Sequence, residues 1–206
     1  MGNRDCVIFA AGEYYNNIPT VPSGAFVVAA DAGLKACRAF GIRPDVILGD
    51  FDSLGTIPTD NNVITLPVEK DVTDTFAAVE EGKKHGCTNF SVYGAMGGRP
   101  DHTYANIALA ADLSKQNCSC VLFGDRYTVT AITDTSLEIT GEIGSTVSVF
   151  SFSEKSEGVT LEGLKYSLNN AALDCYFPLG VSNEFKENKA KITVKNGTLI
   201  IMQQKS

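Results

Sequence analysis

The sequence is poor in the residues that build metal centres from imidazole and thiolate ligands. It has only two histidines, His85 and His102, and its six cysteines include no C-x-x-C pair. A structural zinc site is therefore not expected. Most of the cysteines lie inside apolar segments of a chain with no export signal, so we interpret them as reduced, packed thiols.

Long apolar runs and an excess of positive charge are also missing. No stretch approaches the roughly 18 to 20 apolar residues that span a bilayer, and the first residues lack the apolar run of a signal peptide. We expect a cytoplasmic protein without membrane association. The formal net charge of −7 argues against a nucleic-acid partner, because nucleic-acid-binding proteins usually present a basic face. An anionic small ligand would need a metal bridge.

The chain has an ordinary globular composition, with 44% apolar and 20% charged residues among 206. Its first 124 residues alternate apolar runs typical of buried parallel strands with patterns of helical period, which predicts an open α/β sheet. The expected helices cover 34–40, 73–85 and 102–115, and the expected strands cover 7–12, 27–31, 46–50, 63–67, 90–95 and 121–124.

The remaining residues alternate polar and apolar side chains with a period of two, which predicts an all-β half. The expected strand segments are 136–140, 146–152, 158–166 and 190–202. Asn196-Gly197 predicts a tight type I′ hairpin between 191–195 and 198–202. We therefore predict an α/β domain with an open parallel sheet over 1–130, followed by a smaller, sandwich-like all-β domain over 131–206.

Polar residues follow four of the expected strands in the first half. In an open parallel sheet, ligands bind beyond the carboxyl ends of the strands. The polar positions are Asp31 and the segments Gly49–Ser53, Glu69–Asp74 and Gly94–His102. We expect them to converge on one edge of the sheet and to form one site.

Asp50 and Asp52 form an Asp-x-Asp pair at a strand end, which directs two carboxylates toward one hard cation such as Mg²⁺. The alternative is a turn in which one aspartate caps the backbone. Position at the end of a strand favours the metal site.

Asp71 and Asp74 lie at the expected start of a helix, where one residue can act as N-cap while another faces the cleft. Either Asp71 or Thr73 can provide the cap. We interpret Asp74 as the third neighbour of the metal.

The glycine-rich segment 94–101 precedes the third expected helix and can place backbone N–H groups around an anion. Arg99 adds a planar donor fork that suits phosphate oxygens. The segment is neither a Walker A loop nor a G-x-G-x-x-G fingerprint. Asp101 either caps the helix or belongs to the site, and we interpret His102 as a surface or capping residue.

Taken in order, the segments Gly49–Ser53 (GDFDS), Lys70–Asp74 (KDVTD), Gly94–His102 (GAMGGRPDH) and Gly180–Phe185 (GVSNEF) closely resemble those of thiamine pyrophosphokinases. The resemblance covers nearly the whole chain. It implies transfer of the pyrophosphoryl group of ATP to the hydroxyl of thiamine, with magnesium required, and a homodimer with active sites at the subunit interface.

The resemblance also implies a role for each matching residue. Asp50, Asp52 and Asp74 would hold the metal and the triphosphate, and Arg99 and Asp101 would organise the group in transfer. Ser182 and Asn183 would line the thiamine pocket. The other residues expected to contact ATP, beside Arg99, are Asp31, Ser53, Asp71 and Thr73.

Two other functions share features of this pattern. Metal-dependent glycosyltransferases also use an Asp-x-Asp pair, and they would consume a sugar nucleotide instead of splitting ATP to AMP. A vitamin-binding or nucleotide-sensing protein would bind these ligands without turnover.

Overall fold

The structure is a computed structural model that describes residues 4–15, 17–51, 62–67 and 71–205. The chain divides into two compact units. The first unit comprises Met1–Leu109 and Leu122–Asp125, and the second comprises Ala110–Val121 and Arg126–Ser206.

The first unit is built on a sheet of mainly parallel strands. The strand order is β6-β5-β1-β2-β3-β4, the pairs from β5 to β4 are parallel, and only the end of β6, from Leu122, belongs to this unit. The strands are β1 (Asp5–Phe9), β2 (Phe26–Ala30), β3 (Val46–Gly49), β4 (Val63–Thr65), β5 (Asn89–Tyr93) and β6 (Ser119–Phe123). The chain therefore runs outward from β1 to β4 and then returns to the opposite side of β1 with β5.

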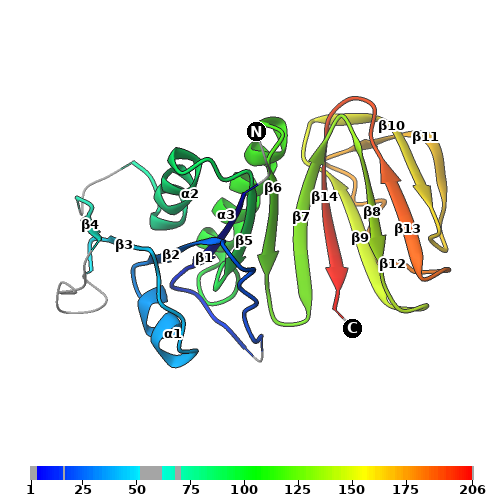
Figure 1. Cartoon of the computed structure of the whole chain (residues 1–206). Coiled ribbons are helices and arrows are strands. Elements are labelled where there is room, and N and C mark those ends of the chain that lie inside the picture. Colours follow the sequence, from blue (N-terminus) through cyan, green and yellow to red (C-terminus); the bar gives the residue numbers. More distant parts are fainter. Residues whose placement is uncertain (1–3, 16, 52–61, 68–70, 206) are drawn as a thin grey trace. The chain divides into compact units, whose positions relative to one another are not determined.

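Three helices accompany this sheet: α1 (Gly33–Ala39), α2 (Asp74–Lys84) and α3 (Pro100–Lys115). Figure 1 shows α1 and α2 on opposite sides of the sheet. Successive side chains of β1 point to opposite faces of the sheet, so each face packs against a different helix. Val7 and Phe9 pack in one core cluster with Leu34 of α1. Cys6 faces α2, where a side-chain carbon at Gly82 would lie 2.9 Å from the Cys6 Sγ. Both faces of the strand are thus buried, as its continuous apolar run predicts.

The three predicted helices are present within a few residues of their expected bounds. α1 and α2 end just before Gly41 and Gly86, whose positive φ of 65° and 78° suits a helix C-terminus. The prediction of a buried strand at 63–67 is wrong in part. β4 is short, and Ile64 and Thr65 are exposed, because the strand lies at the edge of the sheet.

From Arg126 on, the described residues of the second unit form strands and no helix, as predicted, whereas its residues 110–115 belong to α3. Its strands β12-β9-β14-β7 are consecutive members of a ten-stranded sheet, and β11-β10-β13-β8 form a second, four-stranded sheet, with antiparallel pairs in both sets. Val147, Val149, Leu199 and Ile201 from the first sheet share a buried core with residues of the second. The strands are β7 (Tyr127–Thr133), β8 (Ser136–Thr140), β9 (Thr146–Ser151), β10 (Lys155–Glu162), β11 (Leu168–Asp174), β12 (Asn183–Glu184), β13 (Lys189–Thr193) and β14 (Thr198–Gln204).

The predicted hairpin at Asn196-Gly197 is wrong. β13 pairs with β8 and β10, whereas β14 pairs with β7 and β9, so the two strands belong to different sheets. Gly197 has a φ of 113°, but Asn196 is not among the residues with positive φ that a type I′ turn requires. The Asn196 carbonyl instead accepts from the Glu157 N–H at 2.8 Å. The connection therefore crosses from one sheet to the other.

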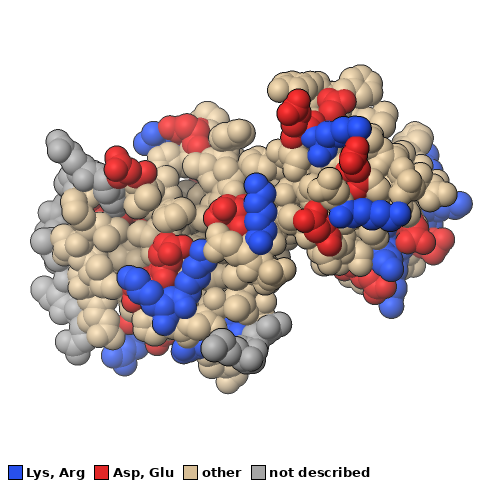
Figure 2. All heavy atoms as spheres, turned by 90° about the horizontal axis from the view of Figure 1, so that it is seen from above, with Lys and Arg blue, Asp and Glu red and all other residues tan. Residues whose placement is uncertain are grey.

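No helix within the described ranges is long and apolar enough to cross a membrane. Figure 2 shows acidic and basic side chains interspersed over the visible face. On that face the described residues form no extended surface of one sign.

Candidate functional site

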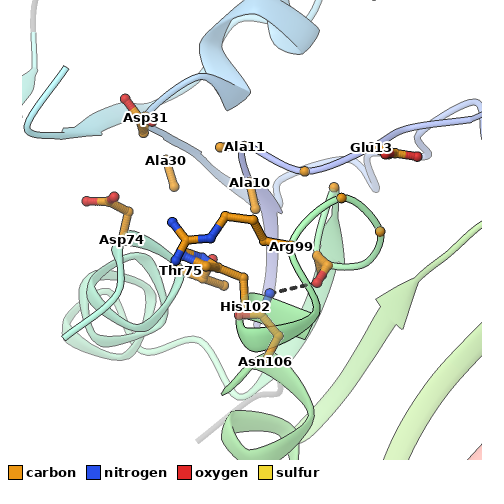
Figure 3. A pocket seen from close by; sticks show the side chains of 15 residues that line it. Ala10, Ala11, Glu13, Ala30, Asp31, Asp74, Thr75, Arg99, His102 and Asn106 are labelled. Atoms are coloured by element: carbon orange, nitrogen blue, oxygen red, sulfur yellow. Dashed lines mark hydrogen bonds between the residues drawn. The ribbon is translucent and has the colours of Figure 1, made fainter. Parts of the chain in front are cut away.

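A cavity of about 390 Å³ lies beyond the carboxyl ends of β1, β2 and β5 (Figure 3). β1 and β5 are neighbours in the sheet although more than seventy residues separate them in the chain. They flank the point where the strand order reverses, which is where open α/β sheets bind ligands. The residues that line the cavity are Ala10, Ala11, Gly12, Glu13, Ala30, Asp31, Asp74, Thr75, Gly94, Ala95, Gly97, Gly98, Arg99, His102 and Asn106.

The turn after β5 forms one wall of this cavity. Gly94 has a φ of 66°, and a side-chain carbon there would lie 2.6 Å from the Ala10 carbonyl oxygen. Only glycine allows this close approach, which is completed by the Gly12 N–H donating to the Gly94 oxygen at 2.9 Å.

The same turn offers hydrogen-bond donors. Within the described residues, the backbone N–H groups from Ala95 to Arg99 donate no hydrogen bond to the protein. These groups precede the N-terminus of α3, the positive end of its dipole. The arrangement suits an anion such as phosphate.

Arg99 stands at the end of this turn and forms a two-bond ion pair with Asp101. Its Nη2 lies 2.6 Å from Oδ2 and its Nε lies 3.2 Å from Oδ1. The hydrogen bonds from Arg99 are the main cause that lowers the pKa of Asp101 to about 2. The ion pair is therefore complete above the ordinary carboxyl pKa of about 4 and is lost only as the pH falls through about 2. Arg99 lines the cavity, whereas Asp101 is not among its lining residues.

Asp31 and Asp74 line the cavity, as expected for residues at strand ends and helix starts. Asp31 follows β2 with a φ of 49°, and its N–H donates to the Leu48 carbonyl at 2.7 Å. Gly49 makes room for this conformation, since a side-chain carbon at Gly49 would lie 3.1 Å from the Cα of Asp31. In Figure 3, Arg99 extends toward the side of the cavity on which Asp74 lies.

Asp50 follows β3 but is not among the lining residues. The next residue, Phe51, is 2% exposed and packs in the core with Leu34 and Cys37, which anchors this segment beside the sheet. Asp52 and Ser53 lie outside the described residues.

The structure shows which of the two candidates, Asp71 or Thr73, is the N-cap of α2. The Thr73 Oγ1 accepts from the Phe76 N–H at 3.2 Å, and Thr73 has extended backbone angles. Thr73, and not Asp71, is the N-cap, and neither residue is among those that line the cavity. The cap places Asp74 at the first position of the helix.

The described residues contain no group of three or more histidine, cysteine, aspartate or glutamate side chains that could hold a metal ion by themselves. Glu13, Asp31 and Asp74 nevertheless give the cavity three carboxylates against one arginine. Mg²⁺ usually binds through one or two carboxylates together with substrate phosphates and waters. The donor set fits that mode of binding.

Ser182 and Asn183 lie in the second unit. Ser182 is exposed with a φ of 55°, and its N–H donates to the Ser148 Oγ at 3.0 Å. Asn183 is 3% exposed and forms two hydrogen bonds with the backbone of Tyr166. Its Oδ1 accepts from the Tyr166 N–H at 3.0 Å, and its Nδ2 donates to the Tyr166 carbonyl oxygen at 2.8 Å. The Asn183 amide thus positions Tyr166.

Apart from three alanines, the lining residues that were not predicted as site residues are Gly12, Glu13, Thr75 and Asn106. His102, which we interpreted as a surface or capping residue, also lines the cavity. Gly12 and Glu13 follow β1, so the rule that placed sites at strand ends could have found them. Thr75 and Asn106 are buried polar residues inside helices, and no local pattern in the sequence marks them.

Comparison with known proteins relates both units to one family. Residues 20–122 match the model described as "Thiamin pyrophosphokinase, catalytic domain", and residues 134–199 match "Thiamin pyrophosphokinase, vitamin B1 binding domain". The chain is 27% identical to a thiamine pyrophosphokinase of Bacillus subtilis over 183 residues, which cover 85% of this chain and 86% of that one. It is 30% identical to thiamin pyrophosphokinase 1 of Caenorhabditis elegans over 161 residues, covering 71% and 65%.

The fold agrees with these matches. A crystal structure of thiamine pyrophosphokinase from Bacillus subtilis superposes with a TM-score of 0.86 at 25% identity, covering 98% of this chain and 100% of that one. On its sequence and its fold, the chain belongs to the thiamin pyrophosphokinase family, enzymes that transfer the pyrophosphoryl group of ATP to thiamine.

Proposed function

We propose that the cavity of the first unit binds the triphosphate of ATP for this transfer. The turn Gly94–Gly98 donates its backbone N–H groups to phosphate oxygens, and Arg99 spans two of them with its planar fork. The observation that carries the assignment is the meeting of this turn, the start of α3 and Arg99 in one cavity.

Asp50, Asp52 and Asp74 are the residues that we assign to Mg²⁺. Asp74 and its neighbour Asp31 support the assignment, because they bring carboxylates to the wall opposite the anion-binding turn. When bound, the metal neutralises charge on the phosphate oxygens. Asp31, Ser53, Asp71 and Thr73 complete the ATP-binding set, with Thr73 acting through its cap on α2.

In the reaction, the hydroxyl oxygen of thiamine forms a bond to the β-phosphorus of ATP, and AMP leaves. Arg99 offsets the charge that gathers on the phosphate oxygens. The hydroxyl proton passes to a carboxylate, for which the candidates are Asp74 and Asp101. The pairing of Asp101 with Arg99 holds the pKa of Asp101 at about 2, which makes Asp101 a weak proton acceptor.

Thiamine binds to the second unit in this proposal, at Ser182 and at the segment that Asn183 holds. Tyr166, which Asn183 fixes at both backbone groups, is 61% exposed, and the Lys165 Nζ lies 5.5 Å from the centre of its ring. The thiazolium cation would therefore pack on the ring face opposite Lys165. In this proposal the domain over 1–130 binds ATP and magnesium, and the domain over 131–206 binds thiamine.

We further propose a homodimer in which the second unit of one subunit meets the first unit of its partner. Exposed apolar side chains near Ser182 support this assembly, since such patches mark interaction surfaces. They are Tyr166, Tyr176, Phe177, Leu179 and Val181, with exposed fractions of 61%, 83%, 64%, 54% and 54%. A cytoplasmic location is supported by the six free cysteines, which suit a reducing compartment.

A single reaction tests the activity. Incubation with ATP, thiamine and Mg²⁺ is expected to yield AMP and thiamine diphosphate in equal amounts, measured by chromatography. Release of ADP, consumption of a sugar nucleotide, or binding of both substrates without AMP would each contradict the proposal.

Replacement of Arg99 by lysine is expected to lower kcat/KM about tenfold to a hundredfold. Lysine keeps the charge but loses the fork that binds two oxygens at once, and a loss of this size corresponds to roughly 1.4 to 2.8 kcal/mol. Steady-state kinetics measure the effect. Arg43→Lys is the matched control, because Arg43 is exposed and does not line the cavity. Equal activity in the two variants would make Arg99 peripheral.

A further inference from the structure

Asn106 is a buried polar residue in the wall of this cavity. It lies on α3, is 4% exposed and lines the cavity together with Arg99 and His102. Figure 3 shows its side chain directed from the helix toward the preceding turn. Burying an amide costs free energy unless its polar groups form hydrogen bonds. The hydrogen-bond partner of Asn106 therefore indicates what this residue does.

That partner is the backbone of the anion-binding turn. The Asn106 Nδ2 donates to the Ala95 carbonyl oxygen at 2.7 Å. A carbonyl can only accept, so the contact identifies Nδ2 as the amide group that faces the turn. Ala95 is itself 3% exposed, and a bond shielded from water in this way is stronger than one at the surface.

The bond constrains a segment that is otherwise permissive. Gly94, Gly97 and Gly98 all have positive φ, and glycine loses more conformational freedom on ordering than other residues do. The peptide between Ala95 and Met96 is planar, so the Met96 N–H points away from the Ala95 carbonyl. By fixing that carbonyl, Asn106 also fixes the direction of one N–H in the turn.

We propose that Asn106 is a positioning residue, which binds the Ala95 carbonyl and thereby holds the turn Gly94–Gly98 in the conformation that receives the triphosphate. The inference rests on the proposed function, which assigns this turn to the phosphates of ATP. A turn that is already ordered loses less entropy when it binds its ligand. Affinity for ATP therefore depends on this bond, whereas affinity for thiamine does not.

Asn106→Asp tests the role, because it keeps the shape of the side chain and replaces the donor by an acceptor. The dissociation constant for ATP with Mg²⁺, measured by calorimetry without thiamine, is expected to rise about tenfold, which corresponds to roughly 1.4 kcal/mol. The KM for ATP should rise in parallel while the KM for thiamine stays unchanged. If this variant does not fold, Asn106→Ser removes the same bond without adding charge, and the same result is expected.

Asn17→Asp is the matched control. The Asn17 Nδ2 donates to the Gly124 carbonyl at 2.7 Å, the same kind of bond at the same length, but Asn17 does not line the cavity. This control should lose some thermal stability, though less than Asn106→Asp because the Asn17 bond is only partly buried, and it should keep the wild-type affinity for ATP.

The possible failures can be told apart. Wild-type affinity for ATP in Asn106→Asp, or an equal rise of KM for both substrates, would overturn the positioning role. If Arg99→Lys also leaves ATP binding unchanged, the assignment of the cavity to ATP is at fault instead.

Discussion

Asp74→Asn is expected to reduce turnover by at least about a hundredfold while the fold stays intact. The change removes one negative charge at the cavity with almost no change in volume, and a group that stabilises charge in phosphoryl transfer contributes several kcal/mol. Asp74 is the first residue of α2, so the lost interaction with the helix dipole should lower stability by only about 0.3 to 1 kcal/mol. Steady-state kinetics and thermal unfolding measure the two effects.

Asp112→Asn on α3 is a suitable control, because Asp112 is exposed and outside the cavity lining. Asp50→Asn and Asp52→Asn should resemble Asp74→Asn. If the three carboxylates serve one ion, their effects should not add in double variants. Unchanged magnesium-dependent activity in Asp74→Asn would refute the metal assignment.

Mixed dimers are expected to recover activity from two inactive chains. One chain carries Asp74→Asn, and the other carries Ser182→Arg, which sets a positive charge against the thiazolium cation. If active sites are shared between subunits, each heterodimer has one site with both halves intact. Random exchange makes about half of the dimers mixed, so about a quarter of wild-type activity should return.

Ser182 is preferable to Asn183 for this experiment. Asn183 is buried and bonded to Tyr166, so its replacement would disturb the fold. Ser182 is exposed, and its backbone N–H makes the bond to Ser148. Subunit exchange is confirmed first by mass spectrometry of labelled chains. Absence of recovery despite exchange, or full activity in a monomer, would show that each chain builds its own site.

Local sequence patterns were sufficient for the secondary structure of the first unit. Continuous apolar runs predicted β1, β2, β3 and β5, because a strand buried on both faces carries apolar residues at successive positions. Polar residues after the predicted strands β2, β4 and β5 included Asp31, Asp74 and Arg99, which the cavity brings together. The ordered motifs also identified the family.

Other features depend on partners that lie far away in the chain. The order of the strands sets β5 beside β1, and this pairing adds Gly12 and Glu13 to the site opposite Gly94. Asn106 is recognisable as part of the site only once its bond to Ala95 is known.

The segment at Asn196-Gly197 shows most clearly where local reasoning ends. Its sequence favours a hairpin, but β13 and β14 each gain more by completing a different sheet around the shared core of the second unit. The sequence by itself determined the helices and strands of the first unit, most strands of the second but not β7, β11 or β12, the polar residues at the strand ends, and the family to which the chain belongs. Only the tertiary structure decided which strands pair and which side chains share the cavity, because the free energy of those contacts comes from burial and hydrogen bonding between residues distant in sequence.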